Sequence, residues 1–250
     1  MTSTGPKLFF LAFLTLSACS VPDTPGDVHD PYEPVNRVSH AFNKGTDAVV
    51  LRPVSRVYGT VIPQPVRTGL SNAASNLDTP RSAVNDVLQG DIEDAVHNSF
   101  RFLINTTVGI LGLFDPASRI GLDERNTGFG DTLAVWGAPE GAYLELPLLG
   151  PSNERDAVGQ VVDIIANPIS LAFPGTGDDV AAATRFPSIL NSRFEFSDTF
   201  DSILYESADS YAQLRLFFIE SRRFELNGQG AGEDVFDPFE NLYDGVFDDF

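Results

Sequence analysis

Catalytic or metal-binding chemistry needs histidines, acids or a serine nucleophile at recognisable spacing, and this 250-residue sequence offers no such pattern. Its three histidines, His29, His40 and His97, are scattered, and none belongs to an H-E-x-x-H motif. Ser71 follows Gly69 as in a nucleophile elbow, but the closing glycine and a preceding strand are missing. We therefore expect no enzymatic activity, no metal and no other cofactor.

The reactive side chain that does stand out is the thiol of Cys19, the one cysteine in the chain. A short polar start, an apolar run over residues 8–16 and the small residues Ser17 and Ala18 precede it, as in an export signal. The apolar run is too short for a transmembrane helix, which needs roughly 20 residues. A lone cysteine in an exported chain cannot form an internal disulfide, so it requires another explanation.

Leu16-Ser17-Ala18-Cys19 resembles the lipobox of bacterial lipoproteins. That resemblance implies a diacylglycerol thioether on Cys19, cleavage before it and acylation of the new amino terminus. Two or more acyl chains anchor a protein stably, whereas one binds only marginally. By resemblance to lipoprotein sorting rules, Ser20 favours the outer membrane over the inner membrane. The alternative is an ordinary secretory signal with a chance cysteine beside the cleavage site.

Charge excludes one class of partner. Residues 1–18 contain one lysine and no acid, so their removal changes the formal charge from −19 to −20. Such a chain repels nucleic-acid phosphates, and we expect no nucleic-acid binding. It is not attracted to anionic lipid head groups either. Membrane contact must therefore come from the lipid on Cys19 and from apolar burial.

The elements that would position any site are mainly helical. We expect a lipoprotein signal peptide over residues 1–18, a tether over 19–29, one helical domain over 30–226 and an acidic, aromatic, disordered tail over 227–250. Proline and glycine make residues 127–159 mostly loop, with a strand at 143–146. The apolar spacing predicts helices at 35–58 with a bend at Pro53, at 66–78, at 80–101 with Pro80 in its first turn, at 178–193 and at 203–226.

Two segments are unusually apolar. Residues 102–114 carry no charge, and as a helix they would be hydrophobic on nearly every face. Such a helix is buried either in protein or in lipid, and both alternatives remain open. Thirteen helical residues rise about 20 Å, too little to cross a bilayer of roughly 30 Å. A second stretch, residues 161–173, has no basic residue and is broken at Pro168.

The tail differs from the domain in composition. Residues 233–250 contain seven acids, no base and five aromatic side chains near helical spacing. This segment either folds on a basic partner with an apolar groove or simply adds solubility. If it binds a soluble carrier, its removal should leave folding intact and weaken lipid handover.

From Asp30 onward the sequence resembles the MlaA (VacJ) family of outer-membrane phospholipid-transport lipoproteins. The resemblance covers roughly residues 30–225 and excludes the tail. The matching residues are Asp30-Pro31-Tyr32-Glu33, Asn36-Arg37, Arg52-Pro53, Pro63-Gln64-Pro65-Val66-Arg67, Gly69-Leu70-Ser71-Asn72, Asn76-Leu77, Asn85, Leu88-Gln89-Gly90, Arg101-Phe102, Asn105-Thr106, Gly109, Gly112, Asp115, Phe129-Gly130-Asp131-Thr132-Leu133, Trp136-Gly137, Gly141-Ala142-Tyr143, Leu146-Pro147, Gly150-Pro151-Ser152 and Arg155-Asp156.

The resemblance implies a non-enzymatic lipid conduit. It implies an irregular helical ring lying in the periplasmic leaflet of the outer membrane, with a central amphipathic channel. Phospholipid that has strayed into the outer leaflet would pass down this channel to a soluble periplasmic carrier. A trimeric porin would be a further partner of the protein. The alternative is a structural or virulence-associated outer-membrane lipoprotein that binds a partner and moves no lipid.

Two groups of residues suit a lipid path. Asn105, Thr106 and Thr107 are polar groups inside an apolar run, where they could meet a lipid head group, although bonds to the helix backbone would explain each of them as well. The loop around Pro139, with Gly137 and Gly141, could act as a hinge at the channel.

Overall fold

The computed structural model describes residues 28–230, with side chains described up to residue 226. Cys19, most of the tether and the tail from residue 231 onward lie outside the described residues. The predictions made for them therefore stay predictions.

The described chain is mainly helical, with 73% helix and 4% strand, which confirms the predicted fold class. Strands β1 and β2 form an antiparallel hairpin in which Tyr143 pairs with Asn153. The elements are α2 (Glu33–Thr46), the π-helical turn η1 (Asp47–Leu51), α3 (Arg52–Val61), α4 (Gln64–Gln89), α5 (Ile92–Thr107), the short 3-10 turn η2 (Ser118–Ile120), α6 (Phe129–Val135), β1 (Tyr143–Leu146), β2 (Gly150–Asn153), α7 (Glu154–Ile165), α8 (Pro168–Ala172), α9 (Thr176–Glu195), α10 (Ser197–Asp201), the π-helical turn η3 (Ser202–Glu206) and α11 (Ser210–Gly230).

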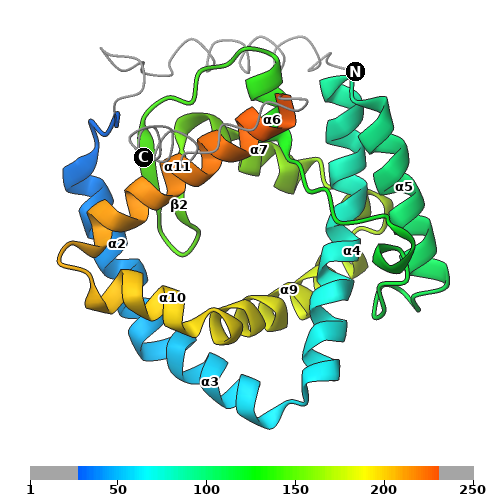
Figure 1. The fold of residues 1–250 in the computed structure, drawn as a ribbon, viewed down its shortest axis with the longest axis horizontal. Coiled ribbons are helices and arrows are strands. Elements are labelled where there is room, and N and C mark those ends of the chain that lie inside the picture. Colours follow the sequence, from blue (N-terminus) through cyan, green and yellow to red (C-terminus); the bar gives the residue numbers. More distant parts are fainter. Residues whose placement is uncertain (1–27, 231–250) are drawn as a thin grey trace, which may run out of the picture.

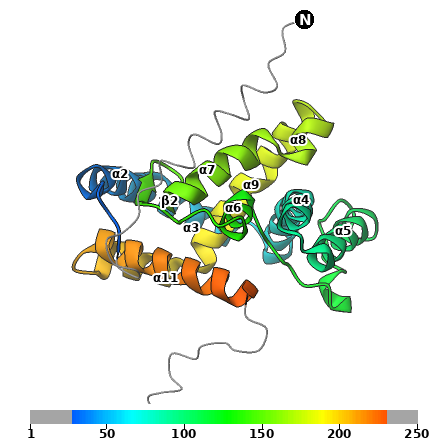
Figure 2. The same ribbon diagram turned by 90° about the horizontal axis from the view of Figure 1, so that it is seen from above.

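The helices follow one another around a ring (Figure 1). On one side lie α2 and α3, and on the other α4 with α5 packed beside it. Helix α9 contacts both α3 and α4, and α11 returns across the ring toward α6. Seen from the side, the ring is shallow, with α8 toward one face and α11 toward the opposite face (Figure 2).

Side-chain caps fix several helix starts, because the first N–H groups of a helix lack partners within it. The Asp91 carboxylate accepts from the Asp94 N–H at 2.9 Å and begins α5. Asn153 accepts from the Asp156 N–H at 2.7 Å and begins α7. Asn167, followed by Pro168, begins α8 and confirms the predicted break at that proline.

The predicted helix boundary at Pro80 is wrong. Helix α4 continues through Pro80 and ends at Gly90, where φ is +84°. Glycine adopts this left-handed conformation readily, and the Asp91 N–H then donates to the Asp86 carbonyl at 2.9 Å, as at a typical helix end. Packing of α4 against α5 and α9 outweighs the local cost of the proline.

The predicted helix over residues 102–114 is only half formed. Helix α5 ends at Thr107, and Ile110, Leu111 and Gly112 all have positive φ. This reversal lets the N–H groups of Leu111 and Gly112 donate to the last carbonyls of α5, at 2.9 and 2.8 Å. The remaining residues form turns whose apolar side chains, such as Val108 and Phe114, are exposed rather than buried in protein.

The segment 127–159 is less irregular than predicted. The strand predicted at 143–146 is confirmed as β1, but α6, β2 and the start of α7 also lie in this segment. Near the C-terminus, the predicted helix 178–193 matches α9, whereas residues 203–206 belong to η3 and α11 begins only at Ser210. Helix α11 continues to Gly230, beyond the predicted domain boundary at residue 226.

Hydrophobic packing inside the ring is limited. The one buried hydrophobic cluster identified in the described part joins β1 to α11 through Tyr143, Tyr211 and Ile219, with Phe218 beside them. The rings of Tyr143 and Tyr211 meet edge to face with centroids 5.9 Å apart. Most of the remaining interior is polar.

Candidate functional site

The buried side chains of the ring are mostly polar, and many of its exposed side chains are large and hydrophobic. Among the described residues, 25 buried side chains are polar or charged and only 11 are hydrophobic, six of them alanine. At the same time, 42 large hydrophobic side chains are exposed, among them Ile165 and Leu111, each 71% exposed. A water-soluble fold shows the reverse distribution, so this exterior is suited to an apolar environment.

No single helix within residues 28–230 is both long and apolar enough to cross a bilayer. The segment Glu154–Ala172, which contains α7 and α8, reaches that length and composition only when it is combined with α9. The chain bends by 117° between this segment and α9. The exposed hydrophobic side chains of the described part are distributed over elements from α2 to α11.

The polar interior includes a seam where α4, α6 and α7 meet. The Asn85 amide donates to the Asp163 carboxylate at 3.1 Å and accepts from the Thr132 hydroxyl at 3.0 Å. Gln89 donates to the hydroxyls of Thr132 and Thr127, at 3.1 and 2.8 Å. We call these five residues the polar seam. Their mutual bonds satisfy buried polar groups that would otherwise destabilise the fold.

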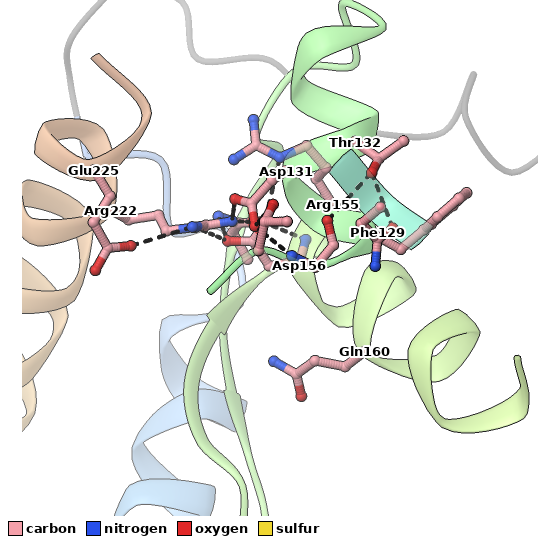
Figure 3. Close-up of polar contacts among 12 residues, drawn as sticks. Phe129, Asp131, Thr132, Arg155, Asp156, Gln160, Arg222 and Glu225 are labelled. Atoms are coloured by element: carbon pink, nitrogen blue, oxygen red, sulfur yellow. Dashed lines mark hydrogen bonds and ion pairs between the residues drawn. The ribbon is translucent and has the colours of Figure 1, made fainter. Parts of the chain in front are cut away.

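A cluster of charged groups joins α11 to α6 and α7 (Figure 3). Arg222 extends from α11 and donates to the Asp156 carboxylate at 2.8 and 3.1 Å and also to Asp131. Burial alone would lower the pKa of Arg222, but the two carboxylates outweigh it and raise that pKa. The guanidinium therefore stays charged, and it closes the ring.

A cavity of about 540 Å³ lies on one side of the polar seam. It includes Asp86 and Gln89 of α4, Arg125 and, from α11, Leu226; we call it the α11-side cavity. Burial raises the pKa of Asp86 to about 6, while donation from Asn98 opposes the rise and the charge of Asp94 adds to it. This carboxyl therefore titrates close to neutral pH.

Asp86→Asn is expected to raise stability at pH 7.5 by about 1–2 kcal/mol and to leave it unchanged at pH 4. The folded pKa of Asp86, about 6, exceeds the ordinary value of 3.8, so the folded state keeps a proton that the unfolded state releases. Stability therefore falls as pH rises from about 4 to 6 and stays lower above that window. The full shift would correspond to about 3 kcal/mol, and screening in the open cavity reduces it.

The measurement is denaturant unfolding of the detergent-solubilised protein at both pH values. Asp179→Asn, which removes an exposed acid, is the control and should change little at either pH. Equal gains for Asp86→Asn at pH 4 and pH 7.5 would contradict the assignment.

A second cavity, of about 480 Å³, lies on the other side of the seam among α4, α7, α8 and α9. We call it the α8-side cavity. Its lining residues on α4 are Asp78 and Arg81, whereas those of the α11-side cavity are Asp86 and Gln89. Asn85 of the polar seam lies between these two pairs along the helix. Helices α8 and α11 lie toward opposite faces of the ring (Figure 2); the α8-side cavity includes Ser170 of α8, and the α11-side cavity includes Leu226 of α11.

The three polar residues predicted for a lipid path lie together at the end of α5, but they bond within the protein. Asn105 is 3% exposed, donates to Asp115 at 2.9 Å and accepts from the Ala117 N–H at 3.1 Å. Thr106 accepts from Asn76 at 3.0 Å. The Thr107 hydroxyl donates to the Leu103 carbonyl at 2.6 Å, so it bonds to the helix backbone, which was the alternative to contact with a lipid head group. Their role as lipid contacts stays a prediction.

The predicted hinge lies in the loop between α6 and β1. Gly137 and Gly141 have φ of +89° and +73°, and Pro139 lies between them. A Cβ on Gly141 would come within 2.5 Å of the Glu154 carboxylate, so this glycine also permits close packing on α7. A hinge movement here remains a prediction.

Sequence reasoning missed the buried ion pairs. Arg193 of α9 donates to Asp47 at 2.8 Å and to Asp201 at 2.6 Å, and like Arg222 it joins elements far apart in the chain. Proximity in the sequence could not reveal these pairs. Ser71 lies within α4 and accepts from Asn191 at 3.4 Å, so it is not on a strand-to-helix elbow. No group of His, Cys, Asp and Glu in the described part could hold a metal ion.

Residues 28–225 match the family model described as MlaA lipoprotein. A protein of Escherichia coli K12 named intermembrane phospholipid transport system lipoprotein MlaA is 32% identical over 80% of this chain and 79% of its own length. Its Haemophilus influenzae namesake is 33% identical over 80% of both chains. A Rickettsia felis protein without an assigned function is 37% identical over 76% of this chain and 74% of its own.

A solved structure shares the fold. It was reported under the words "Structural basis for maintenance of bacterial outer membrane lipid asymmetry" and superposes with a TM-score of 0.69. At 30% identity the match covers 79% of this chain and 99% of the other.

Proposed function

This chain belongs to the MlaA lipoprotein family, and from that membership together with its mostly polar buried side chains and exposed hydrophobic ones we propose that it is the outer-membrane lipoprotein of an intermembrane phospholipid transport system. It removes mislocalised phospholipid from the outer leaflet and so maintains the lipid asymmetry of the outer membrane. It does so as a conduit, without catalysing a reaction.

The observation that carries this proposal is the inverted distribution of side chains. A phospholipid has a polar head that is costly to place in hydrocarbon, and a conduit within a membrane must offer that head polar partners. The ring supplies them in the two cavities beside the polar seam, which expose charged and polar side chains. Its exposed hydrophobic side chains meet the surrounding acyl chains.

We further propose that the ring lies in the periplasmic leaflet. The absence of a spanning helix in the described part and the shallow shape of the ring support a position within one leaflet. The turns at residues 108–114 fit the same position, because most of their N–H groups bond to carbonyls of α5 or of the turns themselves instead of needing water. Lipid on Cys19 would hold the protein in that membrane.

Two partners follow from the same proposal. A trimeric porin would neighbour the apolar outer surface, and a soluble periplasmic carrier would receive the lipid. A transport system that connects two membranes needs such a carrier, because a free phospholipid does not cross water readily. The E. coli relative is named as the lipoprotein of an intermembrane transport system, which supports further components.

The experiment that tests the function is deletion of the gene in its own bacterium. We expect phospholipid to accumulate in the outer leaflet of the outer membrane and detergent sensitivity to rise. Surface phospholipid is measured by its accessibility to an added phospholipase on intact cells. A plasmid copy of the wild-type gene should restore low surface phospholipid and resistance to detergent. A copy with Arg56→Gln should do the same, because it alters only the ion pair of an exposed arginine.

Unchanged surface phospholipid together with unchanged detergent sensitivity would eliminate the transport function. The protein would then be a structural or virulence-associated lipoprotein that binds a partner without moving lipid.

A further inference from the structure

The α8-side cavity is a polar chamber beneath an apolar surface. Ile165 of α7 and Leu171 of α8 are 71% and 65% exposed and do not line the cavity, whereas the exposed Ile164 does. The cavity itself exposes charged groups from α4 and α9 as well as the small side chains of Ala181 and Ala182. Its volume of about 480 Å³ falls within the range of small-molecule sites.

Most charged groups around this cavity already have partners. Arg185 of α9 is paired with Asp78 of α4. Asp163 accepts from Asn85 at 3.1 Å and from the Phe129 N–H at 3.0 Å. These pairs fix the walls of the cavity.

Arg81 differs from them. Its Nε is buried, yet within residues 28–230 it has no hydrogen-bond partner. A buried guanidinium N–H without an acceptor is costly, and no ion pair among the described residues relieves it. Arginine binds phosphate oxygens with several parallel donors, so an anionic oxygen in the cavity would complete this side chain.

Charge around the cavity selects among phosphate ligands. Two arginines, Arg81 and Arg185, face three carboxylates, those of Asp78, Asp163 and Asp178. Asp178, in the first turn of α9, forms no ion pair in the described part and is exposed. A phosphate alone would add to this negative excess, whereas a phosphate with an attached ammonium group would not.

We propose that the α8-side cavity binds a zwitterionic phosphoethanolamine head group, with its phosphate on Arg81 and its ammonium on Asp178. This inference rests on the proposed function for the source of the ligand, a phospholipid in the membrane. The cavity then discriminates between phospholipids, favouring phosphatidylethanolamine over the anionic phosphatidylglycerol.

The test is binding of short-chain lipids to the full-length lipoprotein in detergent micelles, followed by native mass spectrometry. We expect dihexanoyl phosphatidylethanolamine to bind about 10-fold more tightly than dihexanoyl phosphatidylglycerol. Arg81→Gln should weaken phosphatidylethanolamine binding at least 10-fold, and Arg81→Lys should recover part of that loss. Asp178→Asn should remove the preference between the two lipids.

Two matched variants control for indirect effects. Asp179→Asn removes the neighbouring exposed acid that does not line the cavity, and Arg56→Gln removes an exposed arginine of α3. Both should keep the wild-type affinities. Thermal unfolding of Arg81→Gln should occur at the wild-type temperature or above it, since no bond of that side chain within residues 28–230 is lost and a buried donor without a partner is removed.

Three results would overturn the proposal. The first is unchanged affinity of Arg81→Gln, and the second is equal or tighter binding of phosphatidylglycerol by the wild type. The third is binding of free phosphoethanolamine or inorganic phosphate as tight as that of the lipid, which would make this a site for a soluble anion. These outcomes are distinct from failure of the transport function, which is measured by surface phospholipid in cells.

Discussion

Replacing Arg222 by methionine is expected to lower the free energy of unfolding by about 3–5 kcal/mol, because it leaves two buried carboxylates without their shared cation. Asp131 and Asp156 are 6% and 8% exposed. Asp156 retains donation from Asn153 at 2.9 Å, and Asp131 retains donation from the Gly128 N–H at 2.8 Å. These remaining bonds place the expected loss toward the lower end of the range.

The loss should be local before it is global. Arg222 connects α11 to α6 and α7, so its removal should release the C-terminal helix from the ring (Figure 3). We expect urea unfolding in detergent to shift to lower concentration, and limited proteolysis to cleave within α11 sooner than in the wild type.

A matched control and a compensating variant separate this effect from a general loss of charge. Arg56→Gln breaks an ion pair whose arginine is 57% exposed, and it should cost less than about 1 kcal/mol. Combining Arg222→Met with Asp131→Asn should recover part of the stability, since Asp131 is then neutral and the Asp156 carboxylate still pairs with buried Arg155 at 3.3 Å. A variant Arg222→Met as stable as Arg56→Gln would show that the cluster does not hold the ring closed.

The helical character of the fold was predictable from the sequence, but the environment of each apolar stripe was not. Val96 and Phe100 on α5 have the spacing of a buried helix face, and the structure exposes them by 49% and 56%. Periodicity identifies the apolar side of a helix without saying whether protein or lipid covers it. The two alternatives left open for residues 102–114 illustrate this, since the apolar side chains of their turns face outward.

The boundaries that were predicted wrongly share a physical cause. Pro80 and Gly90 each weaken a helix locally, and the sequence alone could not say which of them tertiary packing would overrule. The contacts of α4 with α5 and α9 keep the helix continuous through Pro80, so that it ends at Gly90. The same limit applies to the site, because Arg81 and Asp178 are almost a hundred residues apart and only the fold brings them to one cavity.

Loss of function is expected when Cys19 is replaced by serine, even though that residue lies outside the proposed lipid path. Serine cannot form the thioether that lipidation requires. The protein would lose acyl chains that each contribute about 0.8 kcal/mol per buried CH₂ group. With a formal charge of −20 after removal of residues 1–18, the protein gains no attraction to anionic lipid in compensation.

The expected result is failure to complement the deletion strain, together with loss of acyl-chain labelling and of outer-membrane fractionation on a density gradient. Ser20→Ala is the matched control, since it alters the neighbouring small residue, keeps the thiol and should behave as wild type. Cys19→Ser protein that still restored outer-leaflet asymmetry would show that the apolar exterior of the ring suffices for delivery and insertion. Lipidation would then serve another purpose, because the 42 exposed hydrophobic side chains would already hold the ring in the membrane.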